Sequence, residues 1–255
     1  MLEVRSLTKR YSSIPAVDNV SFTIAPGEVL GYLGPNGSGK STTVKIITGL
    51  LEPSCGAVLF QGSNIHSDLP AYKRLIGYVP EEANLYPFLS GLEYLQLVSR
   101  LRGLPEAASD RRSEVLLELF AMRPHRHTPI GAYSKGMRQR ILLIAALLHN
   151  PQLIIFDEPL SGLDVTSALI FRKLVSALSR EGKAIFYCSH VLEVVEKVCS
   201  HVTILQQGKQ LAYGSIDELK QFQAMPSLEA AFSNLVQEVD AGQSAEAIVD
   251  AMVSR

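Results

Sequence analysis

Two short stretches of this 255-residue sequence carry residues whose types and spacing could do chemistry. The first is rich in glycine and ends in a lysine and two hydroxyl residues, in the order Gly34, Pro35, Asn36, Gly37, Ser38, Gly39, Lys40, Ser41 and Thr42. Glycines allow a tight turn whose backbone N–H groups face inward, and such N–H groups bind phosphate. The pattern is that of a loop for a nucleoside triphosphate, with Lys40 on the β- and γ-phosphates and the Ser41 hydroxyl on Mg²⁺.

The second stretch is an apolar run that ends in two acids. Residues 153–156 read as a buried parallel strand, and Asp157 and Glu158 follow directly. Open α/β sheets bind ligands at the carboxyl ends of their strands. We therefore expect Asp157 to bind Mg²⁺ through water, and Glu158 to orient or deprotonate an attacking water. A strand that ends in a solvated acidic turn is the alternative.

Predicted strands and helices place both stretches in an α/β arrangement. A strand at 29–33 leads into the glycine-rich loop, and a helix from about 40 to 50 leaves it with its positive end toward the phosphates. A chance glycine-rich turn is the alternative, but it does not explain a full match to the pattern in this context. The other expected elements are short strands over 2–24 and 54–79, mainly helix over 89–148, buried strands at 184–188 and 202–205, helices at 165–180 and 192–198, and a more polar helical tail beyond 214.

Further motifs occur in the order that the ABC ATPases show. Tyr133–Arg140 reads YSKGMRQR and resembles the signature motif of that family, and it stands shortly before the acidic strand. Ser161–Asp164 resembles the D-loop, and Ser189–His190 resembles the switch-histidine loop. Tyr11 resembles the aromatic residue that stacks on adenine. The resemblance covers roughly residues 1–215 in matching order.

The resemblance implies a fold, a domain division and an activity. The fold would be α/β, a P-loop NTPase core with a mostly parallel sheet, an N-terminal antiparallel β subdomain and an inserted α-helical subdomain. The ATPase domain would span residues 1–215 with its helical subdomain at about 89–149, and residues 216–255 would form a C-terminal helical extension. The protein would be the ATP-binding and ATP-hydrolysing subunit of a transporter, with ATP and Mg²⁺ as cofactors.

The family also implies a head-to-tail dimer, here a homodimer, with two ATP molecules at the interface. Each ATP would lie between the glycine-rich loop of one subunit and the signature of the other, which contributes Ser134 and Gly136. Ser134 fits an N-cap of a helix that runs to about His149, and a helix N-terminus offers free N–H groups and partial positive charge. Loss of the γ-phosphate would remove this contact and loosen the dimer.

Two more site residues follow from the resemblance, each with a plainer alternative. His190 would contact the γ-phosphate and help to hold the attacking water, whereas a histidine at a strand end can also make an ordinary surface hydrogen bond. Asp164 would link the two sites across the dimer, whereas it can also cap the helix that starts near Val165.

Three positions depart from the most familiar family pattern. Glu81 stands where the Q-loop usually has glutamine, and its carboxylate could bind Mg²⁺ or water. Lys135 replaces the first glycine of the signature pair and Met137 replaces its glutamine, but backbone donors survive both changes. Lys135 could favour a nearby phosphate, although a positive φ there would strain it. With Leu85-Tyr86-Pro87 and the tail sequence 227–232, these variants resemble the ABC-2-type branch, mostly bacterial exporters.

A membrane function would need a partner, because the longest uninterrupted apolar run, 141–148, has eight residues and a spanning helix needs about 20. The start of the chain also lacks the apolar core of a signal peptide. We expect an integral membrane permease subunit, with this chain peripheral at the cytoplasmic face of the membrane. The apolar residues 85–89 could receive a helix of that partner, or they could form a core-facing loop.

Composition bears on other partners. The hydrophobic share of 47% and the charged share of 19% are those of a globular protein. A net charge of −1 provides no overall basic field, so we expect no nucleic-acid partner, and we interpret the arginine-rich stretch 100–140 as a solvated helical surface. Cys55, Cys188 and Cys199 show no ligand spacing and suit reduced thiols.

Two other function classes are the competing interpretations. A non-transport ABC protein that acts on ribosomes or DNA usually carries two ATPase units or a long coiled-coil insertion, whereas this sequence shows one unit and no sustained heptads. A P-loop kinase should carry an acceptor site and a lid. A regulatory GTPase should carry a base-reading motif such as Asn-Lys-x-Asp, and the sequence has no such motif.

Overall fold

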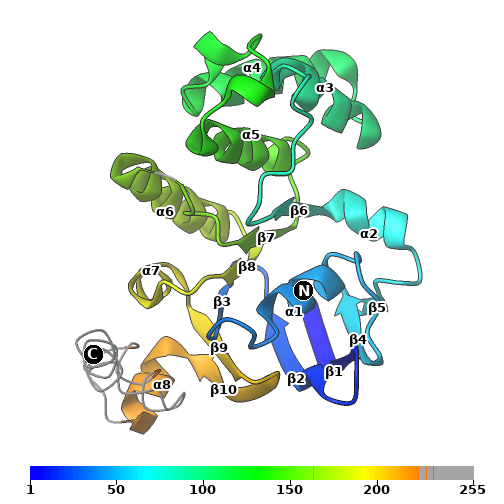
Figure 1. Ribbon diagram of the computed structural model, residues 1–255, viewed down its shortest axis with the longest axis vertical. Coiled ribbons are helices and arrows are strands. Elements are labelled where there is room, and N and C mark those ends of the chain that lie inside the picture. Colours follow the sequence, from blue (N-terminus) through cyan, green and yellow to red (C-terminus); the bar gives the residue numbers. More distant parts are fainter. Residues whose placement is uncertain (163, 224–227, 229–231, 233–255) are drawn as a thin grey trace, which may run out of the picture.

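The computed structural model describes residues 1–162, 164–223, 228 and 232, and within them ten strands form one sheet (Figure 1). The strand order across this sheet is β5-β4-β1-β2-β10-β9-β3-β8-β7-β6. The strands are β1 (Leu2–Arg10), β2 (Pro15–Ile24), β3 (Val29–Leu33), β4 (Cys55–Phe60), β5 (Ser63–Asn64), β6 (Ile76–Val79), β7 (Leu153–Asp157), β8 (Ala184–Cys188), β9 (His201–Gln206) and β10 (Lys209–Ser215).

Helices pack on both faces of the sheet. One face receives the helix that follows the glycine-rich loop, and the other receives helices from the second half of the chain. The helices are α1 (Lys40–Ile47), α2 (Leu69–Leu75), α3 (Gly91–Leu101), α4 (Glu106–Leu119), α5 (Lys135–Leu147), α6 (Val165–Arg180), α7 (Leu192–Val198) and α8 (Ile216–Gln223), with short 3₁₀ turns η1 (Arg123–His125) and η2 (Ile130–Ala132).

Five neighbouring strands, β6, β7, β8, β3 and β9, run parallel to one another. Their residues alternate between two hydrophobic cores: in β7, Ile155 packs into one core and Phe156 into the other. Burial on both faces explains why these strands are nearly continuous apolar runs. Because the strands are parallel, their carboxyl ends lie along one edge of the sheet.

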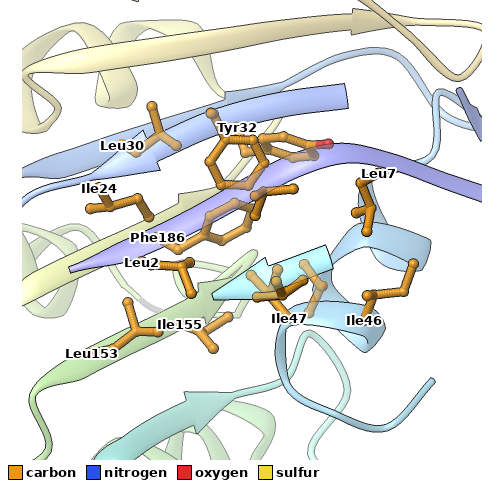
Figure 2. Packing of buried hydrophobic residues seen from close by; sticks show 14 of the residues in the cluster. Leu2, Leu7, Ile24, Leu30, Tyr32, Ile46, Ile47, Leu153, Ile155 and Phe186 are labelled. Carbon is orange, nitrogen blue, oxygen red and sulfur yellow. The ribbon is translucent and has the colours of Figure 1, made fainter. Parts of the chain in front are cut away.

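The first core holds α1 between the antiparallel N-terminal strands and the parallel strands. Strand β1 pairs antiparallel with β2 and β4. Figure 2 shows side chains from β1, β3, α1, β7 and β8 converging, among them Leu2, Tyr32, Ile46, Ile155 and Phe186. The rings of Tyr32 and Phe186 lie with their centroids 4.9 Å apart. This packing holds α1 through its middle and its last turn, and the glycine-rich loop leads directly into that helix.

The helices between β6 and β7 have a core of their own. Helices α3, α4 and α5 bury Leu95, Leu117 and Ile144 together, and Figure 1 shows these helices at the opposite end of the molecule from α8. Helix α3 begins with a capping box, in which the side chains of Ser90 and Glu93 each accept the backbone N–H of the other. An inserted helical group of this kind is what the family resemblance implies.

The prediction of strands and turns throughout 54–79 is wrong for Leu69–Leu75, which form α2. The Asp68 side chain caps this helix by accepting the Ala71 N–H at 3.0 Å. The helix buries one residue, Tyr72. A helix of seven residues with one buried position shows no apolar stripe, so the 3.6-residue spacing that identifies a helix could not be recognised in the sequence.

Strand β10 is a further element that the sequence did not indicate. It pairs antiparallel with β9 and meets β2 through the pair Lys209↔Asp18, so it joins the N-terminal strands to the parallel ones. The helical tail expected beyond 214 is described as α8. The rest of that expectation, at 224–227, 229–231 and 233–255, lies outside the described residues.

The arginine-rich stretch lies largely on the surface of the helical group. Arg123 forms ion pairs with Glu114 and Glu118, and Arg100 pairs with Glu106. These exposed pairs agree with a solvated helical surface. Of the helices in the described ranges, none combines the length and the apolar character needed to cross a membrane.

Candidate functional site

Four loops meet at the carboxyl edge of the parallel strands, where β3, β6, β7 and β8 end. A cavity of about 340 Å³ lies there. Its lining is Ala16, Asn36, Gly37, Gly39, Lys40, Ser41, Thr42, Glu81, Asp157, Glu158 and His190. Ten of these eleven residues are predicted site residues, and the sheet brings them together although they are far apart in the sequence.

The glycine-rich loop closes around its own lysine. Gly39 caps α1 with a φ of 102°, and a Cβ there would lie 2.5 Å from the Ala16 carbonyl oxygen, so only glycine fits. The Lys40 Nζ donates to the carbonyl oxygens of Gly34 at 2.7 Å and Pro35 at 3.1 Å. The amine is thereby held inside the loop, next to the positive end of α1.

Gly34, Pro35 and Ser38 belong to this loop but are not among the residues that line the cavity. Ser38 is buried, and a Cβ on Gly34 would lie 2.4 Å from the Ser38 Oγ. The Ser38 N–H also donates to the Pro35 carbonyl oxygen at 3.2 Å, so these three residues form a tight turn within the loop.

Asp157 is a buried acid at the end of β7. Burial, assisted by the charges of Glu81 and Glu158, raises the pKa of its carboxyl to about 6, against opposing effects of Cys188 and Lys40. A buried carboxylate that ionises with difficulty is strongly stabilised by a nearby cation.

Glu158 is held by the end of β8. Its backbone adopts a left-handed φ of 47°, and its N–H donates to the Cys188 carbonyl oxygen at 3.0 Å. The Glu158 Oε1 lies 2.7 Å from the His190 Nδ1, and its Oε2 accepts from the Ser189 Oγ at 3.3 Å. His190 therefore makes a side-chain hydrogen bond, as the plainer alternative for it expected, and the partner is Glu158 at the cavity wall. A strained backbone held by its surroundings is common at functional sites.

The oxygen atoms of this cavity fit Mg²⁺. Ser41, Glu81 and Asp157 line it and offer the hard oxygen ligands that Mg²⁺ prefers. In the described part of the chain, no group of three or more His, Cys, Asp or Glu side chains could hold a metal by itself. Magnesium commonly completes its shell with substrate phosphates and water, so the cavity fits Mg²⁺ that arrives with a triphosphate.

Two predicted site residues have other contacts in this chain. Tyr11 is 64% exposed between β1 and β2, and the Lys9 Nζ lies 5.6 Å from the centroid of its ring. Asp164 caps α6 by accepting the Ser167 N–H at 2.9 Å, and it also accepts from Arg140 at 3.3 Å. The helix-cap interpretation of Asp164 is therefore confirmed.

The signature residues lie on α5, outside the set that lines the cavity of their own chain. Ser134 caps α5 as expected, because its Oγ accepts the Met137 N–H at 3.2 Å. Gly136 lies in the first turn of α5. Lys135 is the first residue of that helix and has helical backbone, so the strain considered for it does not arise.

Ala16 is a lining residue that sequence reasoning missed. It belongs to β2, and its carbonyl oxygen approaches Gly39. An alanine in a strand carries no chemical signal, so only the packing of β2 against the loop reveals it.

Comparison with known proteins points to one family. The family model described as ABC transporter matches residues 17–161. The ABC transporter ATP-binding protein NatA of Bacillus subtilis (strain 168) is 36% identical over 237 residues, which cover 91% of this chain and 96% of NatA.

Solved structures agree with this result. The structure of an ATP binding subunit of an ABC transporter matches with a TM-score of 0.87 and 32% identity, and the match covers 92% of this chain and 99% of that one. The bacterial ABC transporter cassette MJ0796 matches with a TM-score of 0.78 and 26% identity, over 84% of this chain and 98% of that one. MJ0796 has been solved as a dimer and in a dimeric post-hydrolysis state bound to ADP and Pi. The expected α/β fold is confirmed.

The buried carboxyl of Asp157 predicts a pH-dependent stability difference. Its folded pKa is raised from 3.8 to about 6, so the wild-type protein loses about 3 kcal/mol of stability as the pH rises through this interval. Asp157→Asn does not titrate, so the variant should match the wild type near pH ~4 and be more stable by about 2–3 kcal/mol at pH ~8. Urea unfolding without nucleotide or Mg²⁺ measures this difference. Asp217→Asn, at an exposed acid on α8, is the control, and an equal gain at both pH values would contradict the prediction.

Proposed function

The chain belongs to the ABC transporter family as its ATP-binding, ATP-hydrolysing subunit, and on this premise we propose how its cavity handles ATP. The backbone N–H groups of the glycine-rich loop hold the triphosphate, and Lys40 exchanges its two loop carbonyls for the β- and γ-phosphates. The adenine stacks on Tyr11, which is exposed and precedes the strand that contributes Ala16 to the cavity.

The oxygens of Ser41, Asp157 and Glu81 would hold Mg²⁺, with Asp157 acting through water. Magnesium, when bound, would neutralise charge on the phosphates. The raised pKa of Asp157 supports this assignment, because a cation restores the charged form that burial disfavours.

Glu158 is the proposed general base. It orients a water and takes its proton as the water oxygen attacks the γ-phosphorus and the bond to the β-phosphate oxygen breaks, which leaves ADP and phosphate. His190 keeps the carboxylate in place and contacts the γ-phosphate. The observation that carries this proposal is the 2.7 Å contact between His190 and Glu158 at the wall of the cavity.

The working unit is proposed to contain a second ATPase subunit, a copy of this chain in head-to-tail arrangement. Helix α5 has a capped N-terminus with free N–H groups, yet Ser134 and Gly136 are not part of the cavity lining in their own chain. The similar cassette MJ0796 is dimeric, which supports a second ATPase subunit. Ser134 and Gly136 would then meet the γ-phosphate of the partner, Asp164 would link the two sites, and cleavage would let the subunits part.

A separate integral membrane subunit is the proposed docking partner, which would place this chain at the cytoplasmic face of the membrane. A groove of about 430 Å³ includes the exposed leucines Leu50 and Leu101. Cationic side chains share its lining, namely Lys73, Arg74 and Arg102. An apolar groove with a charged rim suits an amphipathic helix of the partner.

The apolar loop 85–89 is a second candidate contact for the membrane subunit. Leu85 packs against buried residues, whereas Tyr86 and Phe88 are exposed, Phe88 by 93%. The loop is thus core-facing at one position and open at others. Burial chiefly raises the pKa of Tyr94 on α3, the neighbouring Tyr86 raises it further and Arg102 lowers it.

Export and the domain division complete the proposal. Export rests on the resemblance of the variant motifs to the ABC-2-type branch. We assign residues 1–215 to the ATPase domain, with its helical subdomain at about 89–149, and residues 216–255 to a C-terminal extension. Glu196 on α7 supports an attached extension, because it pairs with Lys220 on α8 and accepts the Leu228 N–H at 3.4 Å.

Glu158→Gln should lower ATP turnover by about 10²-fold or more while ATP binding is kept, because glutamine preserves the shape but accepts no proton. Phosphate release with Mg²⁺ and binding of a fluorescent ATP analogue measure the two properties. Glu52→Gln, at an exposed acid outside the site, should hydrolyse ATP like the wild type. Undiminished turnover in Glu158→Gln would remove Glu158 from this role.

Ser134→Arg should block ATP-driven dimerisation, because it places a bulky side chain at the helix N-terminus that meets the partner's ATP. Size-exclusion chromatography with ATP, in a Glu158→Gln background that retains the nucleotide, reports the dimer. The monomer should still bind ATP. Ser176→Arg, on an exposed position of α6, should dimerise like its parent. An unchanged dimer peak for Ser134→Arg argues against the composite site.

Leu101→Glu should lose the integral membrane protein that co-purifies with the wild-type chain from native membranes. Leu119→Glu is the matched control, because Leu119 is 72% exposed against 78% for Leu101 and lies outside the groove. Mass spectrometry identifies the co-purified proteins. Equal recovery with both variants contradicts the groove, and ribosomes or DNA in place of a membrane protein would favour the non-transport alternative.

A further inference from the structure

A second polar cavity of about 350 Å³ shares a lining residue with the nucleotide cavity, and the proposed reaction does not use it. It is lined by the segment after β6, by the first turns of α5 and by the segment between β7 and α6. Its charged and hydroxyl-bearing residues are Glu81, Glu82, Lys135, Arg138 and Ser161. Glu81 also lines the nucleotide cavity, so one carboxylate belongs to both.

Lys135 ties α5 to the segment that follows Glu158. Its Nζ donates to the Ser161 Oγ at 2.8 Å. Its methylene groups lie against Gly162, where a Cβ would be 2.8 Å from the Lys135 Cδ and where φ is 82°. Gly162 therefore leaves the room that the lysine stem occupies, and a glycine at 135 would supply neither the stem nor the amine.

A second contact from α5 holds the same segment. The buried Gln139 lies one turn after Lys135, and its Nε2 donates to the Pro159 carbonyl oxygen at 3.3 Å. Lys135 and Gln139 thus contact positions 161 and 159, on the segment that leads away from Glu158. The position of this segment depends on the first two turns of α5.

We propose that Lys135 is a positioning residue that acts as a unit with Glu81. These two residues are departures from the familiar family pattern, and each adds a charge to a cavity that also holds Glu82 and Arg138, so the cavity carries two acids and two bases. The glutamine and glycine usual at these positions would bring neither charge. Lys135 holds the segment after Glu158 through Ser161, and its charge balances the carboxylate that Glu81 shares with the nucleotide cavity. This inference rests on the proposed role of Glu158.

The tie to Ser161 is tested by amide hydrogen exchange on the full chain without nucleotide. Lys135→Met keeps an apolar stem but loses the amine, so amides in a peptide over 158–162 should exchange about three-fold faster, as expected for one lost hydrogen bond. Lys135→Arg should restore slow exchange. Lys183→Met is the matched control, because the Lys183 Nζ also donates to a side-chain oxygen, that of Asn150 at 2.7 Å. Unchanged exchange in Lys135→Met would show that the hydrogen bond from Lys135 to Ser161 does not hold this segment.

The pairing with Glu81 is tested by ATP turnover of Glu81→Gln, Lys135→Met and the double variant. The cavity holds two acids and two bases, so each single change leaves it with a net charge and the double variant restores a net charge of zero. The double variant should therefore be at least about three-fold more active than the product of the two single effects. Single effects that simply multiply would overturn the pairing. A wild-type chain without ATPase activity, or an active Glu158→Gln, would count against the proposed function. If those controls behave as expected and Lys135→Met turns over like the wild type, the inference alone fails.

Discussion

The site depends on a property of parallel strands: neighbours in register end at the same edge of the sheet. The pairs Tyr32↔Cys188, Asp157↔Cys188 and Val79↔Phe156 bring the ends of β3, β6, β7 and β8 into one row. The four loops that leave these strands must therefore converge. Residues with quite different local roles, such as a capped helix start, a buried acid and a histidine after a strand, become parts of one cavity because of this register.

That convergence puts opposite charges into a confined volume. Burial raises the pKa of Asp157 to about 6, so the acids at this edge are costly to ionise together. On the facing wall, the Lys40 amine is satisfied by carbonyl oxygens of its own loop. On the proposed function, a triphosphate with a divalent cation would suit both walls at once, because the phosphates would take the N–H groups and the amine while the cation would take the carboxylates. The cavity would then be complementary to the pair rather than to either ion alone.

Helix α5 connects the helical group to the sheet at both of its ends. Its first turns contact the segment after Glu158 through Lys135 and Gln139. Just beyond its other end, the His149 Nε2 lies 2.9 Å from the Ile76 carbonyl oxygen in β6. Because α3, α4 and α5 share one core, we expect them to move as one body. The proposed docking groove takes Leu101 and Arg102 from this body and its other lining residues from the end of α1, from α2 and from β6. A partner docked there would contact both the helical group and the sheet, so it would be mechanically connected to the signature residues on α5.

The sequence alone determined what depends on residues close together in the chain. The glycine-rich loop, the Ser134 cap and the buried parallel strands were all predicted correctly, because turn geometry, capping and two-sided burial leave local patterns. Ten of the residues that line the cavity were named from motifs. Tertiary structure decided what depends on distant contacts: α2, which buries a single residue, Ala16, which only packing places at the loop, and the shared cavity of Glu81 and Lys135. Such contacts form between segments that are far apart in the chain, and the local sequence pattern of one segment does not indicate which other segment it will contact.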